Sequence, residues 1–192
     1  MAKAPAVLSG TPIEQRDFVT LCWNGQIDKV VDTVAQLPDA VHWRRPDTQD
    51  TGLTYAAASG SLGYDVAVFL LAHNADIDAQ SASGMTALMH GAKGGSEAYV
   101  ELFLTRGADQ SLRNNEGMTA EDIAVASGRQ SVVDEFAKHR RRLARAAQEE
   151  TQRIAAAKEK ALREDIAIIC EGTRKDITLK PAPTIRRRAP RA

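Results

Sequence analysis

The hydrophobic positions in the middle of the chain follow helical spacing, broken at intervals by single glycines. Within residues 84–109, a short Ala- and Leu-rich stretch ends at Gly95, and a second apolar set follows at Tyr99, Val100, Leu102 and Phe103. Apolar residues three and four positions apart form one face of a helix. This pattern predicts two short helices joined by a tight turn.

The same pattern recurs along the chain. Thr86 and Thr119 begin two blocks with the letters GMTA and lie 33 residues apart, and Thr51 begins a similar block 35 residues before Thr86. A glycine follows each block at the same register, at Gly25, Gly60, Gly95 and Gly128. A fixed period in this range is the signature of stacked repeats. The sequence therefore predicts four helix-pair units, of which the first is the most divergent.

Each unit carries its own start and stop signals. The threonine hydroxyl can cap the first helix, and the glycine after that helix tolerates a positive φ. Gly107 ends the second helix of one unit, and Asn74 takes the equivalent place in the unit before it. Asn is the non-glycine residue that most readily adopts the left-handed conformation, so the two positions agree. Two additional residues in the second unit fit a loop insertion around 61–64.

The segments TALMHGAKGG with LFLTRGAD, and TYAAASG with FLLAHNAD, resemble ankyrin repeats. The resemblance covers residues 16–138 and implies an all-α ankyrin-repeat solenoid that acts in protein–protein interaction. Ala87 and Ala120 stand where the family prefers proline, and Met89 stands where it prefers histidine. These departures affect a turn hydrogen bond of the family and leave the fold expectation unchanged. Since one unit cannot bury its own apolar face, stacking is expected to stabilise the array.

The family register places the binding surface on the inner helices and the turn tips. Trp and Arg are enriched among interface hot spots, so the N-terminal half is expected to be the richer half. The candidate partner-binding residues are Trp23, Asn24, Trp43, Arg44, Arg45, Asp47, Asp50, Met85, Lys93, Arg113, Glu116 and Met118. The alternative for Trp23 and Trp43 is that each only covers the exposed end of the stack. An exposed binding role is expected for Met85 and Met118.

No Gly or Pro interrupts the sequence from Val132 to about residue 171, and the segment is rich in good helix formers. It predicts one long helix, with residues 139–171 as a charged, Ala-rich extension between the repeat domain and an extended tail at 172–192. The apolar end of this helix should dock on this chain or another. Residues 1–15 are expected to be a flexible N-terminal segment. The residues proposed for a second contact are Ile166, Ile168, Ile169, Arg186, Arg187 and Arg188.

The formal net charge of zero conceals a gradient. Residues 1–138 carry 10 Lys and Arg against 18 Asp and Glu, whereas residues 172–192 carry 7 against 1. The basic tail could add a strand to a partner's sheet, bind nucleic acid phosphates, anionic lipid or an acidic protein, or only be solvated. Its lack of aromatic residues disfavours binding to single-stranded nucleic acid by stacking.

No arrangement of residues nominates a reaction, a metal site or a cofactor, so the chain is expected not to be an enzyme. The histidines are scattered, and no phosphate-binding glycine loop occurs. Cys22 and Cys170 are too few for a disulfide framework and are expected to be reduced, partly buried thiols. No secretory signal or membrane-length apolar run is visible, which favours the cytoplasm.

The leading hypothesis is a protein–protein interaction adaptor or scaffold that binds an unidentified protein partner, without insertion into a membrane. The alternative is a tether to an anionic surface, either nucleic acid or acidic lipid, through the basic tail. A third reading is that the apolar helix end completes the core of another protein, as in a toxin or immunity component. Deletion of residues 172–192 separates the tether from the adaptor.

Overall fold

A computed structural model describes the backbone of residues 14–178 and the side chains of residues 14–170. The expected flexible segment at 1–15 therefore falls almost wholly outside the described residues, as do Arg186, Arg187 and Arg188 of the tail. The chain divides into two units, residues 1–141 and residues 142–192. The first unit contains the repeats, and the second contains most of the long helix.

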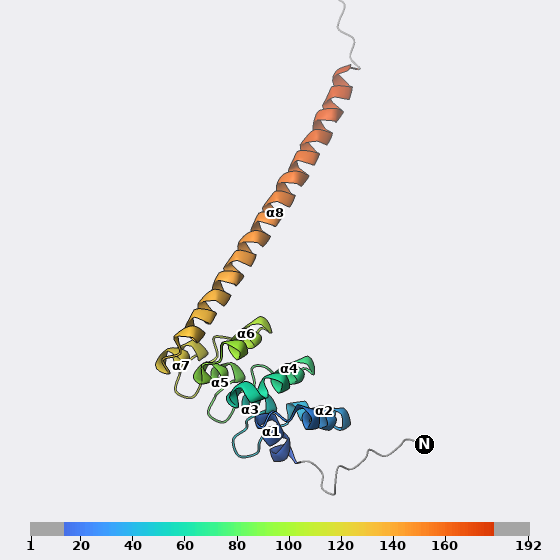
Figure 1. The fold of residues 1–192 in the computed structure, drawn as a ribbon. Helices are drawn as coiled ribbons and strands as arrows, with labels where there is room; N and C mark the ends of the chain where they lie inside the picture. The colour runs from blue at the N-terminus through green and yellow to red at the C-terminus, as the bar shows by residue number, and fades with distance from the viewer. Residues whose placement is uncertain (1–13, 179–192) are drawn as a thin grey trace, which may run out of the picture. The chain divides into compact units, whose positions relative to one another are not determined.

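The first unit is built of consecutive helix pairs, as the repeat pattern predicted (Figure 1). Short 3-10 helices occupy Pro38–His42 and Gly60–Gly63, and the second of these lies where the sequence predicted a loop insertion. The helices are α1 (Gln15–Trp23), α2 (Ile27–Gln36), α3 (Gly52–Ala58), α4 (Tyr64–Ala72), α5 (Ala87–Gly94), α6 (Glu97–Thr105), α7 (Ala120–Ala126) and α8 (Gln130–Thr178).

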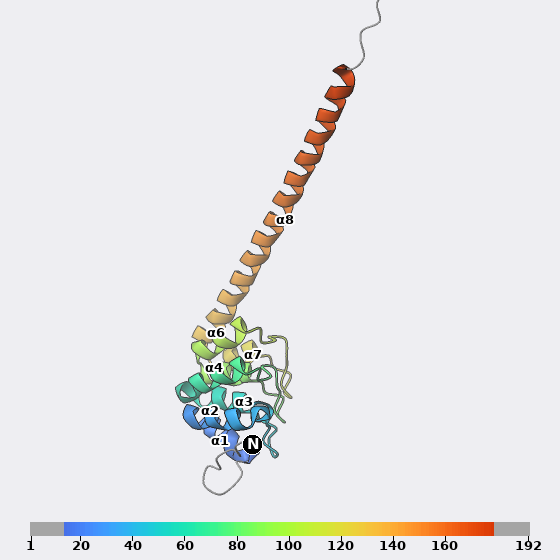
Figure 2. The same cartoon turned by 90° about the vertical axis from the view of Figure 1, so that its right-hand side faces the viewer.

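The helices of the repeats form two layers. The inner helices α1, α3, α5 and α7 contact one another in succession, and α2 and α4 are in contact in the outer layer. Loops on one side connect each outer helix to the next inner helix (Figure 2). Together with α6 and the first turns of α8, these elements form an all-α solenoid. The fold class predicted from the sequence is therefore confirmed for the described residues.

The three predicted cap residues occupy equivalent places. Thr51, Thr86 and Thr119 are the N-caps of α3, α5 and α7, and each side chain accepts a hydrogen bond from the backbone N–H three residues later. Such a bond satisfies one of the amides that a helix start leaves unpaired. The family's preferred histidine is replaced without loss of the cap, because the backbone N–H of Met89 still reaches Thr86 Oγ1 at 3.3 Å.

The predicted stop residues also keep their register. The glycines that follow the inner helices have φ values of 64°, 71°, 78° and 68° at Gly25, Gly60, Gly95 and Gly128. After the outer helices, Asn74 has a φ of 61° and Gly107 a φ of 87°. These left-handed positions allow the chain to reverse sharply between helices. The period of the sequence and the period of the backbone are therefore the same.

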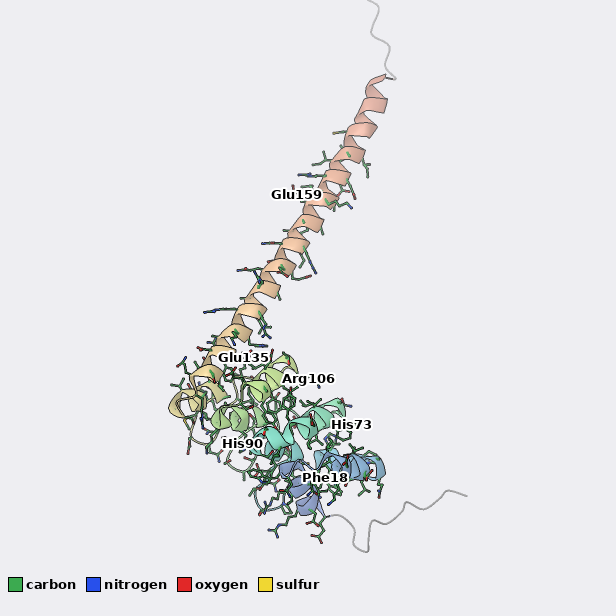
Figure 3. The ribbon with its side chains drawn as sticks, viewed as in Figure 1. Phe18, His73, His90, Arg106, Glu135 and Glu159 are labelled. Carbon is green, nitrogen blue, oxygen red and sulfur yellow. The ribbon has the colours of Figure 1, made fainter. Side chains whose placement is uncertain are left out.

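The core runs along the interface between the two layers. Leu70, Phe103 and Phe136 hold the same place in three successive outer helices, and each is at most 1% exposed. Phe18 contributes from α1 at the N-terminal end of this core (Figure 3). Between repeats, the hydroxyl of Tyr99 on α6 donates a 2.7 Å hydrogen bond to the carbonyl of Ala56 on α3. Burial and this polar contact hold neighbouring repeats in one register.

The long C-terminal helix begins earlier and ends later than the sequence indicated. The helix α8 runs from Gln130 to Thr178, so residues 172–178 of the segment expected to be extended are helical. A single glycine inside a helix costs only about 1 kcal/mol, and Gly172 therefore does not end it. All described side chains from 142 to 170 are exposed, including those of Ile166, Ile168 and Ile169 at 51%, 69% and 66%.

Candidate protein-binding surface

The turn tips that precede the inner helices are joined to one another. The backbone N–H of Ala82 donates to the carbonyl of Thr48 at 2.8 Å, and that of Asn115 donates to the carbonyl of Ser83 at 3.1 Å. The Gln80 amide adds bonds to the carbonyls of Gly84 and Arg113, both at 3.0 Å. This hydrogen-bonded row gives the tips a fixed geometry beside the inner helices, which is a condition for specific binding.

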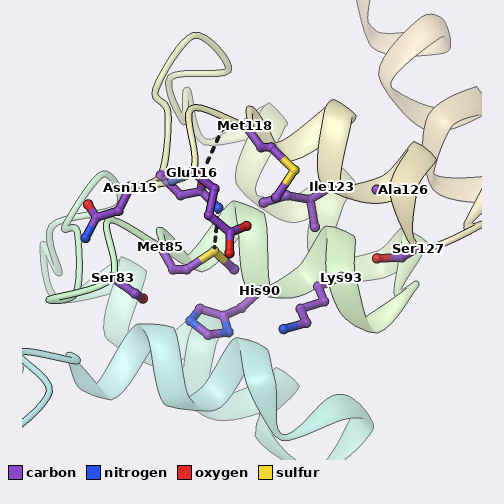
Figure 4. A pocket seen from close by; sticks show the side chains of 11 residues that line it. Ser83, Met85, His90, Lys93, Asn115, Glu116, Met118, Ile123, Ala126 and Ser127 are labelled. Atoms are coloured by element: carbon purple, nitrogen blue, oxygen red, sulfur yellow. Dashed lines mark hydrogen bonds between the residues drawn. The ribbon is translucent and has the colours of Figure 1, made fainter.

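A hollow of about 400 Å³ lies between the tips and the inner helices of the last two repeats (Figure 4). We call it the C-terminal hollow. Four of its eleven lining side chains are apolar and seven are polar or charged, so it can offer both apolar contact and hydrogen bonds. It is lined by Ser83, Met85, His90, Lys93, Asn114, Asn115, Glu116, Met118, Ile123, Ala126 and Ser127.

The charged and titratable groups of the C-terminal hollow lie on different walls. His90 and Lys93 belong to α5, whereas Glu116 belongs to the tip before α7 (Figure 4). Burial lowers the pKa of His90 because it disfavours the protonated ring, and the nearby Lys93 acts in the same direction. Asp50 opposes this effect. The hollow therefore presents a neutral imidazole next to a cationic side chain at neutral pH.

A second hollow, of about 330 Å³, lies at the N-terminal end of the stack of inner helices and is lined by Thr20, Trp23, Arg45 and Tyr55. We call it the N-terminal hollow. The rings of Trp23 and Tyr55 meet edge to face, with centroids 5.6 Å apart. Arg45 Nη1 donates a 2.6 Å hydrogen bond to the Tyr55 hydroxyl, which raises the pKa of Arg45. Asp47 fixes the other side of this guanidinium, with an Nε–Oδ1 distance of 2.9 Å.

The structure separates the roles of the two tryptophans. The side chain of Trp23 is 43% exposed and lines the N-terminal hollow. Trp43 is half-buried and packs edge to face on Phe18, with centroids 5.8 Å apart. Phe18 is fully buried, so Trp43 covers the end of the core. Trp43 therefore matches the alternative, that a tryptophan only covers the end of the stack. Binding of a partner by Trp23 stays a prediction.

The expected exposure of Met85 is wrong. Met85 is only 9% exposed, because the next turn tip covers it, and the Asn114 amide lies 3.7 Å from its sulfur. Met118 is half-buried, since no further tip follows it. Both methionines still line the C-terminal hollow, where they form part of its apolar surface.

The other candidate residues are divided among the tips. Arg44 spans two of them through a 2.9 Å bond to the carbonyl of Gln80, and Arg113 Nη1 donates to the carbonyl of Gly117 at 2.6 Å. Arg44 therefore joins two tips, whereas Arg113 stabilises the tip to which it belongs. Lys93 and Glu116 line the C-terminal hollow. Asn24 is exposed next to Trp23, and Asp50 is half-buried at the start of α3.

The sequence interpretation missed a row of residues on the inner helices. Thr20, Tyr55, His90 and Ile123 occupy the same repeat position, and the last three each lie four residues after a cap threonine. Each lines one of the two hollows. The repeat register could have identified this row, because each of the four residues lies five positions before the glycine that follows its inner helix.

Residues 14–170 hold no group of three or more His, Cys, Asp or Glu side chains placed to bind a metal ion. No described helix combines the length and apolar character needed to cross a membrane. Cys22 is buried and Cys170 is exposed, so the expectation that both are partly buried is wrong for each. Burial raises the pKa of the Cys22 thiol to about 12.

The repeats have a counterpart among known families. Residues 53–145 match the family model of ankyrin repeats, in three copies. The chain contains an ankyrin-repeat domain. Its first helix pair, α1–α2, precedes the matched residues but ends its inner helix with the same left-handed glycine, Gly25. No curated protein matches the sequence. Ankyrin repeats are in general protein–protein interaction modules, and the two hollows lie on their inner helices.

Proposed function

We propose that the chain is a non-enzymatic adaptor that binds a protein partner through the inner helices and turn tips of its ankyrin-repeat domain. The C-terminal hollow is the observation that carries the proposal. It combines the apolar side chains of Met85, Met118 and Ile123 with Lys93 and Glu116 at its walls. A surface that combines apolar side chains with hydrogen-bonding and charged groups gives both affinity and specificity.

We further propose a second contact through the helix α8 and the basic tail. Ile166, Ile168 and Ile169 are each more than half exposed on α8. Exposed clusters of large aliphatic side chains are costly in water and often mark interaction sites. The arginines at 186–188 extend this proposal to the tail, which carries 7 basic residues against 1 acidic residue between positions 172 and 192.

The same charge excess favours the second candidate, a tether to nucleic acid or acidic lipid through the tail. Phosphate binding by several Lys and Arg residues weakens steeply with salt, whereas apolar docking does not. A cytoplasmic setting is part of the proposal for either function. It is supported by the two cysteines, Cys22 and Cys170, neither of which forms a disulfide.

Cross-linked affinity capture from extracts of the source cells tests the adaptor. Lys93→Glu reverses the charge in the C-terminal hollow, and Lys29→Glu makes the same change on the outer helix α2 as its matched control. We expect Lys93→Glu to reduce recovery of the main partner about tenfold, because like charges would then face each other in the interface. Lys29→Glu should leave recovery unchanged.

Equal recovery with both charge reversals would contradict binding at the inner helices. Deletion of residues 179–192 separates the adaptor from the tether. If binding to DNA or to phosphatidylserine vesicles disappears while partner recovery is intact, the tail acts as a tether. If the partner itself is lost from the deleted chain, the tail belongs to the protein interface.

A further inference from the structure

The two hollows divide the inner surface of the ankyrin domain between them. The N-terminal hollow is made by α1, α3 and the tip between them, so it belongs to the first two repeats. The C-terminal hollow is made by α5, α7 and their tips, so it belongs to the last two. In the repeat register, Ala58 at the end of α3 holds the position of Trp23 on α1 and of Lys93 on α5, and Ser59 follows it; both are half-buried. These small side chains leave room for a backbone to pass from one hollow to the other.

The spacing of the hollows sets the kind of segment that can fill both. Packed helices lie about 8–10 Å apart, so two hollows separated by two repeats are about 20 Å apart. An extended backbone advances about 3.3 Å per residue and covers this distance in about six residues. Because side chains alternate along an extended chain, residues i and i+6 point to the same side. An α-helix rises only about 1.5 Å per residue and would need about thirteen residues.

We propose that the partner contributes an extended segment with two apolar anchor side chains about six residues apart, one for each hollow. The inference rests on the proposed function and deepens it. A partner of this kind needs no pre-folded surface, because two anchors on one strand give avidity through the backbone that joins them. The hollows act as a pair only when that backbone has the matching length.

The walls of the hollows select different anchors. Trp23 and Tyr55 present two rings at an interplanar angle of 67°, with the Arg45 guanidinium 5.7 Å from the Tyr55 centroid. Aromatic side chains pair well with such edges and with a guanidinium, so the N-terminal hollow favours an aromatic anchor. Met118 and Ile123 form an apolar wall of the C-terminal hollow, and the adaptable side chain of Met118 favours Leu, Ile or Met there.

The positive charge of Lys93 predicts an acidic residue in the partner segment between the two anchors. Lys93 on α5 is exposed, and no ion pair with it occurs among the described residues. Lys93 lines the C-terminal hollow from α5, the helix of that hollow that contacts α3, so it meets the partner segment where that segment enters the hollow. An acidic residue of the partner at this point would pair with it. The expected order is therefore an aromatic residue, an acidic residue and an aliphatic residue.

A phage-displayed library of random peptides, selected against the full chain, tests this motif directly. Selected peptides should carry an aromatic and an aliphatic residue five to seven positions apart. Their affinities are then measured by fluorescence polarisation against variants that fill one hollow each. Thr20→Trp fills the N-terminal hollow and Ser127→Trp fills the C-terminal one, because both residues are exposed and line these hollows. Ser131→Trp, at an exposed position on α8 outside both hollows, is the matched control.

We expect Thr20→Trp and Ser127→Trp each to weaken binding at least tenfold, and Ser131→Trp to leave it unchanged. A peptide shortened by two residues between the anchors can reach only one hollow at a time. Its affinity should therefore be changed by only one of the two tryptophan substitutions. Peptides with a single anchor, or sensitive to only one filling, would overturn the two-anchor inference and leave the proposed surface intact. Insensitivity to both fillings would overturn both. A selection that yields no specific peptide would also overturn the inference of an extended segment.

Discussion

The guanidinium of Arg140 donates two hydrogen bonds to the carboxylate of Glu121, from Nη1 to Oε2 at 2.6 Å and from Nη2 to Oε1 at 3.0 Å. The pair joins the outer helix of the last repeat to its inner helix. Paired N–H donors on one guanidinium fix a carboxylate in both position and orientation. Neither residue has a like counterpart in the earlier repeats.

The repeat register shows what this pair replaces. Glu121 stands two residues after its cap threonine, where the earlier repeats have Leu53 and Leu88, each 1% exposed. Val125 stands where Ala92 is fully buried, but it is 62% exposed because no further repeat covers α7. A polar outer face on the last unit is what a repeat array needs at its end. The ion pair of Glu121 therefore caps the stack.

Arg140 has a second role in the backbone. It lies 33 residues after Gly107, the left-handed residue that ends the previous outer helix. Arginine does not adopt that conformation readily, and it is a good helix former. The outer helix of the last repeat therefore continues, and α8 reaches Thr178. One substitution in the repeat pattern explains both the cap and the long helix.

Arg140→Gly should weaken the helix at the position where the other repeats end theirs. Glycine costs about 1 kcal/mol relative to alanine inside a helix, which corresponds to about fivefold in a local opening equilibrium. Hydrogen exchange of the amides at 142–150 should accelerate by this factor relative to Arg140→Ala, which removes the ion pair but keeps the helix former. Equal exchange in the two variants would show that residue 140 does not control the helix.

Gln49 is a strained residue at the first turn tip. It lies two residues before its cap threonine and has a φ of 57°, whereas Gly84 and Gly117 hold the same place with φ values of 75° and 78°. A side chain in this region costs about 1–2 kcal/mol, and a glycine there would remove that cost. Part of this stabilisation is offset, because glycine has greater conformational freedom in the unfolded chain. Gln49→Gly should therefore raise the free energy of unfolding by about 0.5–1 kcal/mol.

Urea denaturation measures this effect, and the reverse change provides its control. No atom lies within 4 Å of the position that a Cβ would take at Gly117, so Gly117→Ala tests backbone strain without a steric clash. It should lower the free energy of unfolding by about 1 kcal/mol. The side-chain amide of Gln49 donates to the carbonyl of Pro46 at 3.2 Å. If Gln49→Gly destabilised the protein instead, the loss of this hydrogen bond would outweigh the relief of backbone strain.

The sequence predicted the backbone register of this domain better than its surface. Caps and left-handed turns depend on residues such as Thr86 and Gly95 and their immediate neighbours, so local pattern was sufficient to place them. The burial of Met85 depends on Asn114, which belongs to the next repeat. Trp43 likewise covers the end of the core through its contact with Phe18, which lies 25 residues before it. Side-chain exposure is decided by these distant contacts, which no local signal encodes.

The cap of α7 should make stability depend on acid pH. Asp122 Oδ2 accepts hydrogen bonds from the backbone N–H and the hydroxyl of Thr119, at 2.9 and 2.8 Å, and these bonds hold the pKa of Asp122 below its ordinary value of 3.8. A lowered pKa stabilises the fold above the ordinary value, and the stabilisation is lost as the pH falls through the lower, native pKa. Asp122→Ala should therefore lower Tm at pH 7, and the difference should shrink as the pH falls below 3.8.

Thr119 provides the control for this pH effect. Thr119→Ser keeps the hydroxyl that accepts from the Asp122 backbone N–H, so it should preserve the acid dependence. Thr119→Ala removes the hydroxyl and should cost about 1 kcal/mol at neutral pH. A Tm difference between the wild type and Asp122→Ala that stays constant from pH 7 to acid would show that the carboxylate is not bound to the cap.

Tyr99 should make stability fall at alkaline pH. Burial raises its pKa to about 12, because the phenolate would lose hydration, and this loss outweighs the hydrogen bond with Ser59 that lowers the pKa. Its hydroxyl donates to the carbonyl of Ala56, which also accepts a 2.8 Å bond from the hydroxyl of Ser59. Since that carbonyl keeps one partner, Tyr99→Phe should cost only about 1 kcal/mol at neutral pH.

The alkaline measurement follows from the sign of this shift. A pKa raised above the unfolded value of 10 contributes stability that is complete below pH 10 and is lost as the pH rises to about 12. The Tm difference between the wild type and Tyr99→Phe should therefore shrink across this interval. The difference in tyrosinate absorbance between the two proteins isolates Tyr99 and should show its midpoint at about 12. A midpoint at 10 would mean that the hydroxyl is open to water and that α6 does not bond to α3 in solution.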